Sequence, residues 1–393
     1  MAFGRRRKTQ PENTTFSISD PVLAEFFSVG PRNYSGVAVG EHSALGISAF
    51  YRAGSLISST IAGLPLRSLR DVEGVRTRVS SFLDNPGGPE GPTPFSWKET
   101  VVLHLFCHGD SFLQHIFNGA GAVIALVPIH PLAVSVEWDD KVPGGKLFTA
   151  TLADGTRQTF DASTMTQVMG PSLDGLRGMS VISVARNSLG TAIAGDRAAA
   201  KMFSSGALHS GMVTPEEDVT EDEARVIKDS LNSKTAGWEN AGEIAVVNRR
   251  LKFTPWTMSL EDAQFLQSRQ FQVQEIARWT GVPASLLMDP GAVSTWGTGV
   301  EIQNRGLARY TLAGYTSRIE ERLSRLLSSA RFCEFDYAGL LQPAPEVEIP
   351  LLLKQVEAGV MTVNEYRRIR NMDPIEGGDV LRSAAPAPEA VPV

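Results

Sequence analysis

Apolar side chains recur at helical spacing over Ser43–Ala62, the first strongly patterned segment of the chain. Gly63 follows directly, and Pro65 prevents the helix from continuing. The next residues, Leu64–Leu69, alternate between apolar and polar positions. The pattern therefore predicts a helix followed by a short strand.

A second helix is expected over Ser96–Phe106, with Ser96 as its N-cap and Glu99 at the capping-box position. Short apolar runs after it predict a series of strands, and Asp154-Gly155 between the last two is a hairpin signal. The predicted strands are 112–117, 122–127, 134–138, 147–152 and 156–160. About the first 165 residues thus indicate an α+β unit.

Beyond residue 178 the pattern becomes that of long helices, expected over 180–205, 260–280 and 300–327. An acidic insert of about 50 residues separates the first two, with a helix after Thr220 and strands over 243–247 and 252–256. The second long helix carries a candidate apolar stripe of Leu266, Phe271, Ile276 and Trp279. Two long helices with an insert between them suggest an antiparallel rod with a small knob. Such a rod leaves apolar surface bare, so we expect identical neighbours in a ring or bundle.

The last part of the chain is again helical in pattern, after a strand over 332–335. One helix is expected over 346–358, and a second begins at the capping box Thr362-Val363-Asn364-Glu365. The final residues, 383–393, alternate Ala, Pro and Glu and are expected to be disordered.

Composition narrows the possible functions of these 393 residues. The chain has 42% apolar and 20% charged residues, as in ordinary folded proteins, and a net charge of −6. That charge argues against tight, static binding to DNA phosphates. No apolar run reaches the ~18 residues of a membrane helix, and no signal peptide is visible, so we expect a protein that stays inside the cell that makes it. Its two cysteines exclude a disulfide framework.

Catalytic motifs are weak throughout. The closest candidate is His104, Cys107 and His108, where the two histidines at i, i+4 would share one helix face. A metal-dependent enzyme using these residues is the alternative hypothesis; zinc normally has three or four protein ligands, and His115 is a guessed third one. No carboxylate or paired ligand motif completes that site, which favours hydrogen-bonded histidines on a part-buried helix. We therefore expect no enzyme activity, no cofactor and no bound metal.

A glycine-rich loop over 288–299 holds Trp296, whose ring could stack on a base or touch a DNA backbone. The competing interpretation is that Trp296 anchors the loop by packing. The sequence favours neither the DNA contact nor the packing role of Trp296.

The order of these parts resembles the portal proteins of tailed bacteriophages, in the branch found in long-tailed phages. The resemblance runs over residues 43–380, and its densest part is Glu261 to Pro283. The other stretches are Ile61-Ala62-Gly63-Leu64-Pro65-Leu66, Leu173-Asp174-Gly175-Leu176-Arg177-Gly178-Met179-Ser180, Glu239-Asn240-Ala241-Gly242, Thr362-Val363-Asn364-Glu365 and Asp373-Pro374-Ile375-Glu376-Gly377-Gly378. Val181 stands where the family has proline, which puts local contacts in doubt.

The resemblance implies a portal-type α+β fold with an α/β wing, two antiparallel stem helices, a small α/β clip, a tunnel loop and helix, and a helical crown. The implied boundaries are 1–42 for an N-terminal arm, 43–179 for the wing, 180–205 and 259–281 for the stem helices, 206–258 for the clip, 282–299 for the tunnel loop region, 300–328 for the tunnel helix, 329–345 for a return strand to the wing, 346–382 for the crown and 383–393 for the tail.

The resemblance also implies a homo-oligomeric ring, of the dodecameric type, in the virion at one capsid vertex. Such a ring would contact the major capsid protein, pass double-stranded DNA during packaging and ejection, and dock the terminase large subunit and later a head–tail adaptor, without a membrane. The implied DNA-channel residues are Ser294, Thr295, Trp296, Thr298, Glu301 and Arg305. The candidate clip residues for docking are Glu216, Glu217, Asp218, Arg249 and Arg250.

Overall fold

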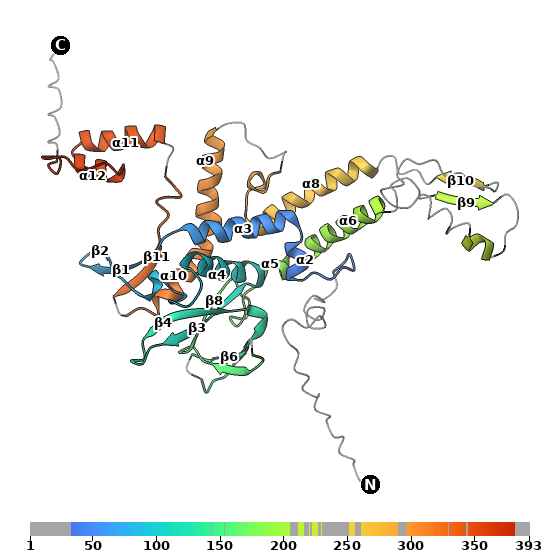
Figure 1. The fold of residues 1–393 in the computed structure, drawn as a ribbon, viewed down its shortest axis with the longest axis horizontal. Helices are drawn as coiled ribbons and strands as arrows, with labels where there is room; N and C mark the ends of the chain where they lie inside the picture. Colours follow the sequence, from blue (N-terminus) through green and yellow to red (C-terminus); the bar gives the residue numbers. More distant parts are fainter. Residues whose placement is uncertain are drawn as a thin grey trace, which may run out of the picture. The chain divides into compact units, whose positions relative to one another are not determined.

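The computed structural model describes residues 33–142, 144–152, 154–204, 211–215, 220, 222–226, 229, 251–255, 261–289, 297–328, 330–342 and 345–381 (Figure 1). The chain divides into two compact units, Met1–Phe335 and Asp336–Val393. Each unit has its own helices, so each is described by itself.

Helices and strands are mixed along the described chain. Those of the first unit are α2 (Glu41–Leu45), α3 (Ser48–Gly63), α4 (Pro94–His108), α5 (Val181–Val184), α6 (Arg186–Ser204), α8 (Glu261–Thr280), α9 (Gly297–Gly306) and α10 (Ala313–Ser324), with the short 3-10 turns η1 (Phe82–Asp84), η2 (Pro131–Ala133) and η4 (Ala284–Leu287) and the π-helical segment η6 (Leu307–Leu312). The second unit contains α11 (Pro345–Glu357) and α12 (Val363–Ile369).

The strands of the first unit form small antiparallel sheets, with the orders β11-β1-β2, β4-β3-β8, β5-β6-β7 and β10-β9. Their bounds are β1 (Leu66–Val72), β2 (Val75–Arg78), β3 (Asp110–Phe117), β4 (Val123–Ile129), β5 (Val134–Trp138), β6 (Lys146–Thr151), β7 (Arg157–Phe160), β8 (Met165–Met169), β9 (Gly211–Pro215), β10 (Leu251–Pro255) and β11 (Arg331–Phe335). The mixed helix and sheet class expected from the sequence is confirmed.

Two of these sheets pack together through a shared apolar cluster. Phe112 of β3 and Met165 of β8 meet Phe148 of β6 and Phe160 of β7, all nearly fully buried. The rings of Phe112 and Phe148 lie 5.9 Å apart in an edge-to-face arrangement. Burial alternates along β6, where Phe148 and Ala150 point into this core, whereas most of β3 is buried on both faces.

The helical part of the core lies between α3 and α4, which pack side by side. Phe50 of α3 and Phe106 of α4 have ring centroids 4.9 Å apart, and both are buried. A Cβ on Gly54 would lie 2.9 Å from the Phe106 ring, so glycine lets these helices approach closely. Trp97 is fully buried, and its Nε1 donates to Leu126 O at 2.7 Å, which ties α4 to β4.

The helices α6 and α8 also pack against each other, and they run antiparallel as the sequence predicted (Figure 1). Arg269 of α8 pairs with Asp196 of α6 at 2.8 Å, and Trp279 Nε1 donates to Ser188 Oγ at 3.1 Å. The residue numbers therefore rise on one helix as they fall on the other.

Several predicted boundaries were wrong by a few residues. Helix α4 begins at Pro94 with Thr93 as its N-cap instead of Ser96, because proline fits the first helical position and Thr93 Oγ1 accepts from Ser96 N. The long first helix breaks at Gly46 and Ile47 into α2 and α3. The helix expected from 180 breaks between α5 and α6, and α9 begins at Gly297, inside the predicted loop.

The predicted apolar stripe of α8 is only partly covered by the described part of the chain. Ile276 is buried, whereas Phe271 is 54% exposed and Trp279 is 42% exposed. Helical spacing alone does not tell whether an aromatic side chain meets its own chain or another surface. The strands β2, β8 and β9 were not predicted, and the expected strand at 252–256 appears as β10, paired with β9.

The second unit confirms the capping-box prediction. Thr362 Oγ1 accepts from Glu365 N at 3.1 Å, and Glu365 Oε2 accepts from Thr362 N at 2.8 Å. Asn364 of α12 is buried and bonds Ile375 through both its amide nitrogen and its oxygen. These bonds hold the segment at Ile375 on α12.

Candidate functional site

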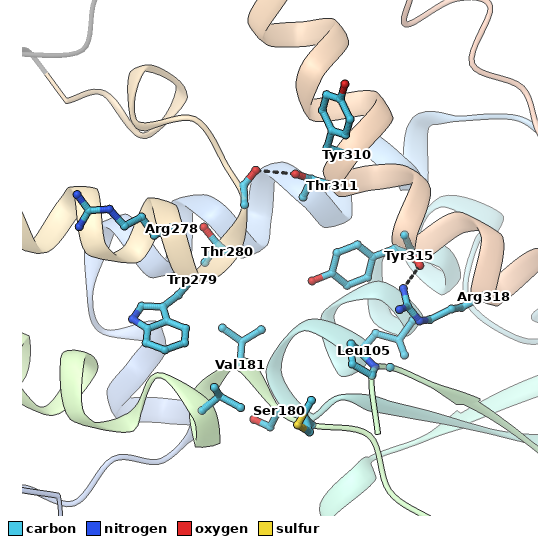
Figure 2. A pocket seen from close by; sticks show the side chains of 16 residues that line it. Leu105, Ser180, Val181, Arg278, Trp279, Thr280, Tyr310, Thr311, Tyr315 and Arg318 are labelled. Atoms are coloured by element: carbon cyan, nitrogen blue, oxygen red, sulfur yellow. Dashed lines mark hydrogen bonds between the residues drawn. The ribbon is translucent and has the colours of Figure 1, made fainter. Parts of the chain in front are cut away.

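A pocket of about 480 Å³ lies among α4, α5, the end of α8, η6 and the start of α10 (Figure 2). Its walls mix aliphatic and aromatic side chains with a few hydroxyl and guanidinium groups. The lining residues used below are Val184, Trp279, Gly281, Tyr310, Thr311 and Tyr315.

Large side chains at this pocket are partly open to solvent. Tyr310 is 80% exposed, and the nearby Val184 and Trp279 are also exposed. Tyr315 points into the pocket (Figure 2), and burial raises the pKa of its phenol to about 12, so this hydroxyl stays protonated at neutral pH. The pocket therefore offers an apolar surface with the neutral hydroxyl of Tyr315 and the charged guanidinium groups of Arg278 and Arg318.

The end of α8 is fastened to η6 at the pocket wall. Thr311 Oγ1 donates to Gly281 O at 2.6 Å. Gly281 has φ +69, and a Cβ there would lie 3.0 Å from Thr311 Oγ1. Gly281 thus ends α8 in a left-handed conformation, and its lack of a side chain leaves room for Thr311 of η6.

A buried carboxylate joins the sheets to the start of the long helices. Asp110 is fully buried and accepts hydrogen bonds from Gly178 N at 3.0 Å and from Gln167 Nε2 at 2.8 Å. Arg177 Nε lies 3.2 Å from Asp110 Oδ2. Burial raises the pKa of Asp110, while Arg177, Gln167 and Gly178 act in the opposite direction.

The same joint depends on a close backbone approach. A Cβ on Gly178 would lie 1.8 Å from Gly109 O, so no other residue fits without movement. Arg177 Nη1 donates to Val134 O at 2.9 Å, which adds β5 to the joint. The motif Asp174–Gly178 stands out in the sequence, but its partner Asp110 does not. Gly178 lies 68 positions after Asp110, and no local pattern links the two residues.

The histidines singled out in the sequence form a cluster with different members. His108 Nε2 lies 3.0 Å from Glu41 Oε2, and His130 Nε2 lies 3.3 Å from the same oxygen. These bonds hold the pKa of Glu41 far below its usual range. The pKa of His104 is lowered to about 3, first by burial and then by the nearby charges of His130 and His108. Glu41 and His130 had no signal in the sequence that linked them to His108.

Two other members of the hypothetical metal enzyme do not join this cluster. Cys107 is buried, and burial raises the pKa of its thiol to about 12, which disfavours the thiolate that binds metal. His115 is buried elsewhere, with its ring nitrogens 2.8 Å from Ser163 O and 2.7 Å from Thr166 Oγ1. The guess that His115 completes a site with His104 was wrong.

The predicted DNA-channel residues are only partly within the described part of the chain. Ser294, Thr295 and Trp296 lie outside it, and Thr298 and Glu301 are described only as backbone of α9. Arg305 lies in the last turn of α9 and is exposed. The predicted clip residues lie outside the described residues; they are Glu216, Glu217, Asp218, Arg249 and Arg250.

Comparison with known proteins decides the family. The model of the phage portal protein family matches residues 48–371. The chain belongs to this family. The probable portal protein of Streptomyces phage phiC31 is 30% identical over 392 residues, which cover 96% of this chain and 85% of that protein. The portal protein of Enterobacteria phage HK97 is 29% identical over 363 residues, covering 88% and 84%.

Solved structures agree on the portal fold. A HK97-family phage portal protein from Corynebacterium diphtheriae has a TM-score of 0.60 at 19% identity, covering 78% of this chain and 99% of that one. A chain from the neck of a native gene transfer agent particle, computed with C12 symmetry, has a TM-score of 0.55 at 20% identity, covering 84% and 91%.

Membership in the family gives the chain the function of a portal protein, a virion component at the capsid vertex. The alternative hypothesis of a metal-dependent enzyme built on His104, Cys107 and His108 receives no support from these matches. Among the helices that the structure describes, none combines the length and apolar character needed to cross a membrane.

Proposed function

We propose that this portal protein assembles into a homo-oligomeric ring at one capsid vertex, of the dodecameric type, which conducts double-stranded DNA during packaging and ejection. The observation that supports ring assembly is the exposure of three aromatic side chains on the first unit. Phe271 is 54% exposed, Trp279 42% and Tyr310 80%. Exposed aromatic side chains of this size favour contact with another protein surface, and identical subunits supply one.

The subdivision proposed for this ring follows the boundaries expected from the sequence, with a wing over 43–179 and stem helices over 180–205 and 259–281. The clip is assigned to 206–258, the tunnel loop and helix to 282–328, and the crown to 346–382. The antiparallel packing of α6 against α8 supports the assignment of these helices as a paired stem. The pairing of β11 with β1 supports a return of the chain to the wing at residue 331.

The DNA channel in this proposal is lined by the tunnel loop and the start of the tunnel helix. The proposed residues are Ser294, Thr295, Trp296, Thr298, Glu301 and Arg305. A conduit must release DNA at every step, and a net charge of −6 limits the counterion-driven affinity that would act as a brake. Arg305 is the one cation proposed to meet phosphates, from the last turn of α9.

In this proposal the clip binds the terminase large subunit first and a head–tail adaptor later. The outer face of the ring contacts the major capsid protein. The proposed clip residues are Glu216, Glu217, Asp218, Arg249 and Arg250. Charged side chains at an exposed site favour fast and selective association with a surface of opposite charge. We further infer that the protein acts without catalysis of its own and needs no cofactor for this role.

The ring is tested first, by electron microscopy of the purified full chain with two-dimensional class averages. Rings with a central channel are expected, and twelve-fold averages would fix the subunit number. Compact monomers or dimers, both alone and in the presence of the major capsid protein, would contradict the proposal.

The channel is tested by Trp296→Ala in packaged particles. The variant is expected to form rings but to yield particles with less DNA, measured as genome content per particle. Trp138→Ala serves as a control, because Trp138 is an exposed tryptophan on β5. Normal genome content in the Trp296→Ala particles would remove Trp296 from the channel.

A further inference from the structure

Three segments that are far apart in the sequence meet at the cluster of Glu41, His108 and His130. Glu41 is the first residue of α2, His108 is the last residue of α4, and His130 caps η2. We propose that these three side chains form a structural zinc site. The proposal is independent of the ring and of DNA conduction.

The geometry of the three ligand atoms suits a small tetrahedral cation. Zinc bonds of about 2.0–2.1 Å at tetrahedral angles place neighbouring ligand atoms ~3.3 Å apart. The nitrogens of His108 and His130 lie 3.0 Å and 3.3 Å from Glu41 Oε2, and all three atoms lie within 4.8 Å of one another. Small side-chain movements would therefore complete three zinc bonds.

The chemistry of the donors selects the metal class. Two imidazole nitrogens and one carboxylate oxygen are ligands typical of zinc, whereas calcium and magnesium prefer oxygen donors alone. A zinc ion would take the place of the protons on the two Nε2 atoms. Metal binding at Nε2 of His130 would move its proton to Nδ1, and the 3.3 Å bond that Nδ1 accepts from Leu132 N would then be given up.

A second observation points to a ligand at this place. His104 lies one turn before His108 on α4, and its ring centroid is 5.3 Å from that of His130. Its Nδ1 is buried and has no hydrogen-bond partner among the described residues. A buried nitrogen of this kind is unfavourable unless a ligand or water satisfies it. Two histidines at i, i+4 on one helix are also a common zinc-binding pair, so His104 is available for the fourth position after a rotation.

The site would fasten the start of the described chain to the sheets. Helix α2 packs against α3 and α6, while His130 lies between β4 and β5. A metal bound only in the folded state stabilises it in proportion to the logarithm of the free metal concentration. The role inferred is therefore structural and not catalytic.

The test uses the full chain, stripped with a chelator and titrated with Zn²⁺ alone in a calorimeter. One zinc per chain is expected, together with a higher melting temperature. Glu41→Gln and His130→Gln are expected to weaken zinc binding at least tenfold. The matched control is His42→Ala, because His42 is an exposed histidine next to Glu41 on α2. Wild-type chain without a stoichiometric zinc, or equal affinity in all three variants, would overturn the site.

Cobalt keeps the proposal testable if a variant does not fold. Co²⁺ added to the stripped wild-type chain is expected to give the intense visible absorption of a four-coordinate site, without a thiolate charge-transfer band. A weak six-coordinate spectrum, or a thiolate band from Cys107, would refute the assigned ligands.

Discussion

At the joint around Asp110, a fully buried carboxylate bonds the backbone, an amide and a guanidinium, whereas along α8 and η6 large aromatic side chains remain exposed. Both regions lie in the same compact unit. Polar groups that leave water must be paired within the chain, because an unpaired buried charge is strongly unfavourable. Apolar groups that stay in water cost less free energy than an unpaired buried charge, and a second subunit can cover them on assembly. The contrast separates contacts that fold the subunit from contacts available for assembly.

The largest expected effect is at the joint. Asp110→Ala removes the buried acceptor that Gly178 N, Gln167 Nε2 and Arg177 Nε share, and each group left without its partner costs about 1–3 kcal/mol, so the free energy of unfolding should fall by about 3–5 kcal/mol. Urea denaturation of the monomeric chain measures this change. The control is Asp196→Ala, which removes an exposed pair with Arg269 and should change stability by less than about 1 kcal/mol. A similar loss of unfolding free energy in the two variants would contradict the stabilising role assigned to the buried Asp110.

The next effect comes from the close approach at Gly178. Gly178→Ala places a Cβ against Gly109 O, and overpacking of this kind costs about 1–3 kcal/mol. Differential scanning calorimetry should show a lower melting temperature. Gly63→Ala is the matched control, because a Cβ at Gly63 meets no atom within 4 Å. An unchanged melting temperature for Gly178→Ala would mean that the joint is looser than its geometry indicates.

The exposed region should respond in the opposite way. Tyr310→Ser should leave the free energy of unfolding within about 0.5 kcal/mol, because the side chain is 80% exposed. Ring assembly should weaken about tenfold, or ~1.4 kcal/mol per contact, as measured by sedimentation velocity over a concentration series. A large loss of subunit stability with unchanged assembly would reverse the comparison.

The smallest effect tests the backbone of the exposed region. Gly306 joins α9 to η6 with helical φ −60 and ψ −47, and a Cβ there meets no atom within 4 Å. Gly306→Ala should therefore raise the free energy of unfolding by up to about 1 kcal/mol. Gly281→Ala should lower it, because Gly281 has φ +69 and lies against Thr311. Chemical denaturation of both variants checks the opposite signs.

The sequence alone determined the elements whose signals are local. The helical spacing of α3, the capping box at Thr362, the glycine after α8 and the Asp154-Gly155 hairpin each depend on neighbours within a few positions, and each was confirmed. The antiparallel pairing of α6 with α8 also followed from the lengths of the two apolar patterns and the insert between them.

The tertiary structure decided what distant residues do together. Asp110 meets Gly178, and Glu41 meets His108 and His130, through contacts that no local pattern encodes. The exposure of Phe271 was likewise undecided, because the same apolar spacing serves a core or a surface that meets another subunit. Periodicity fixes which residues share a face, while burial and partnership depend on how the whole chain closes around that face.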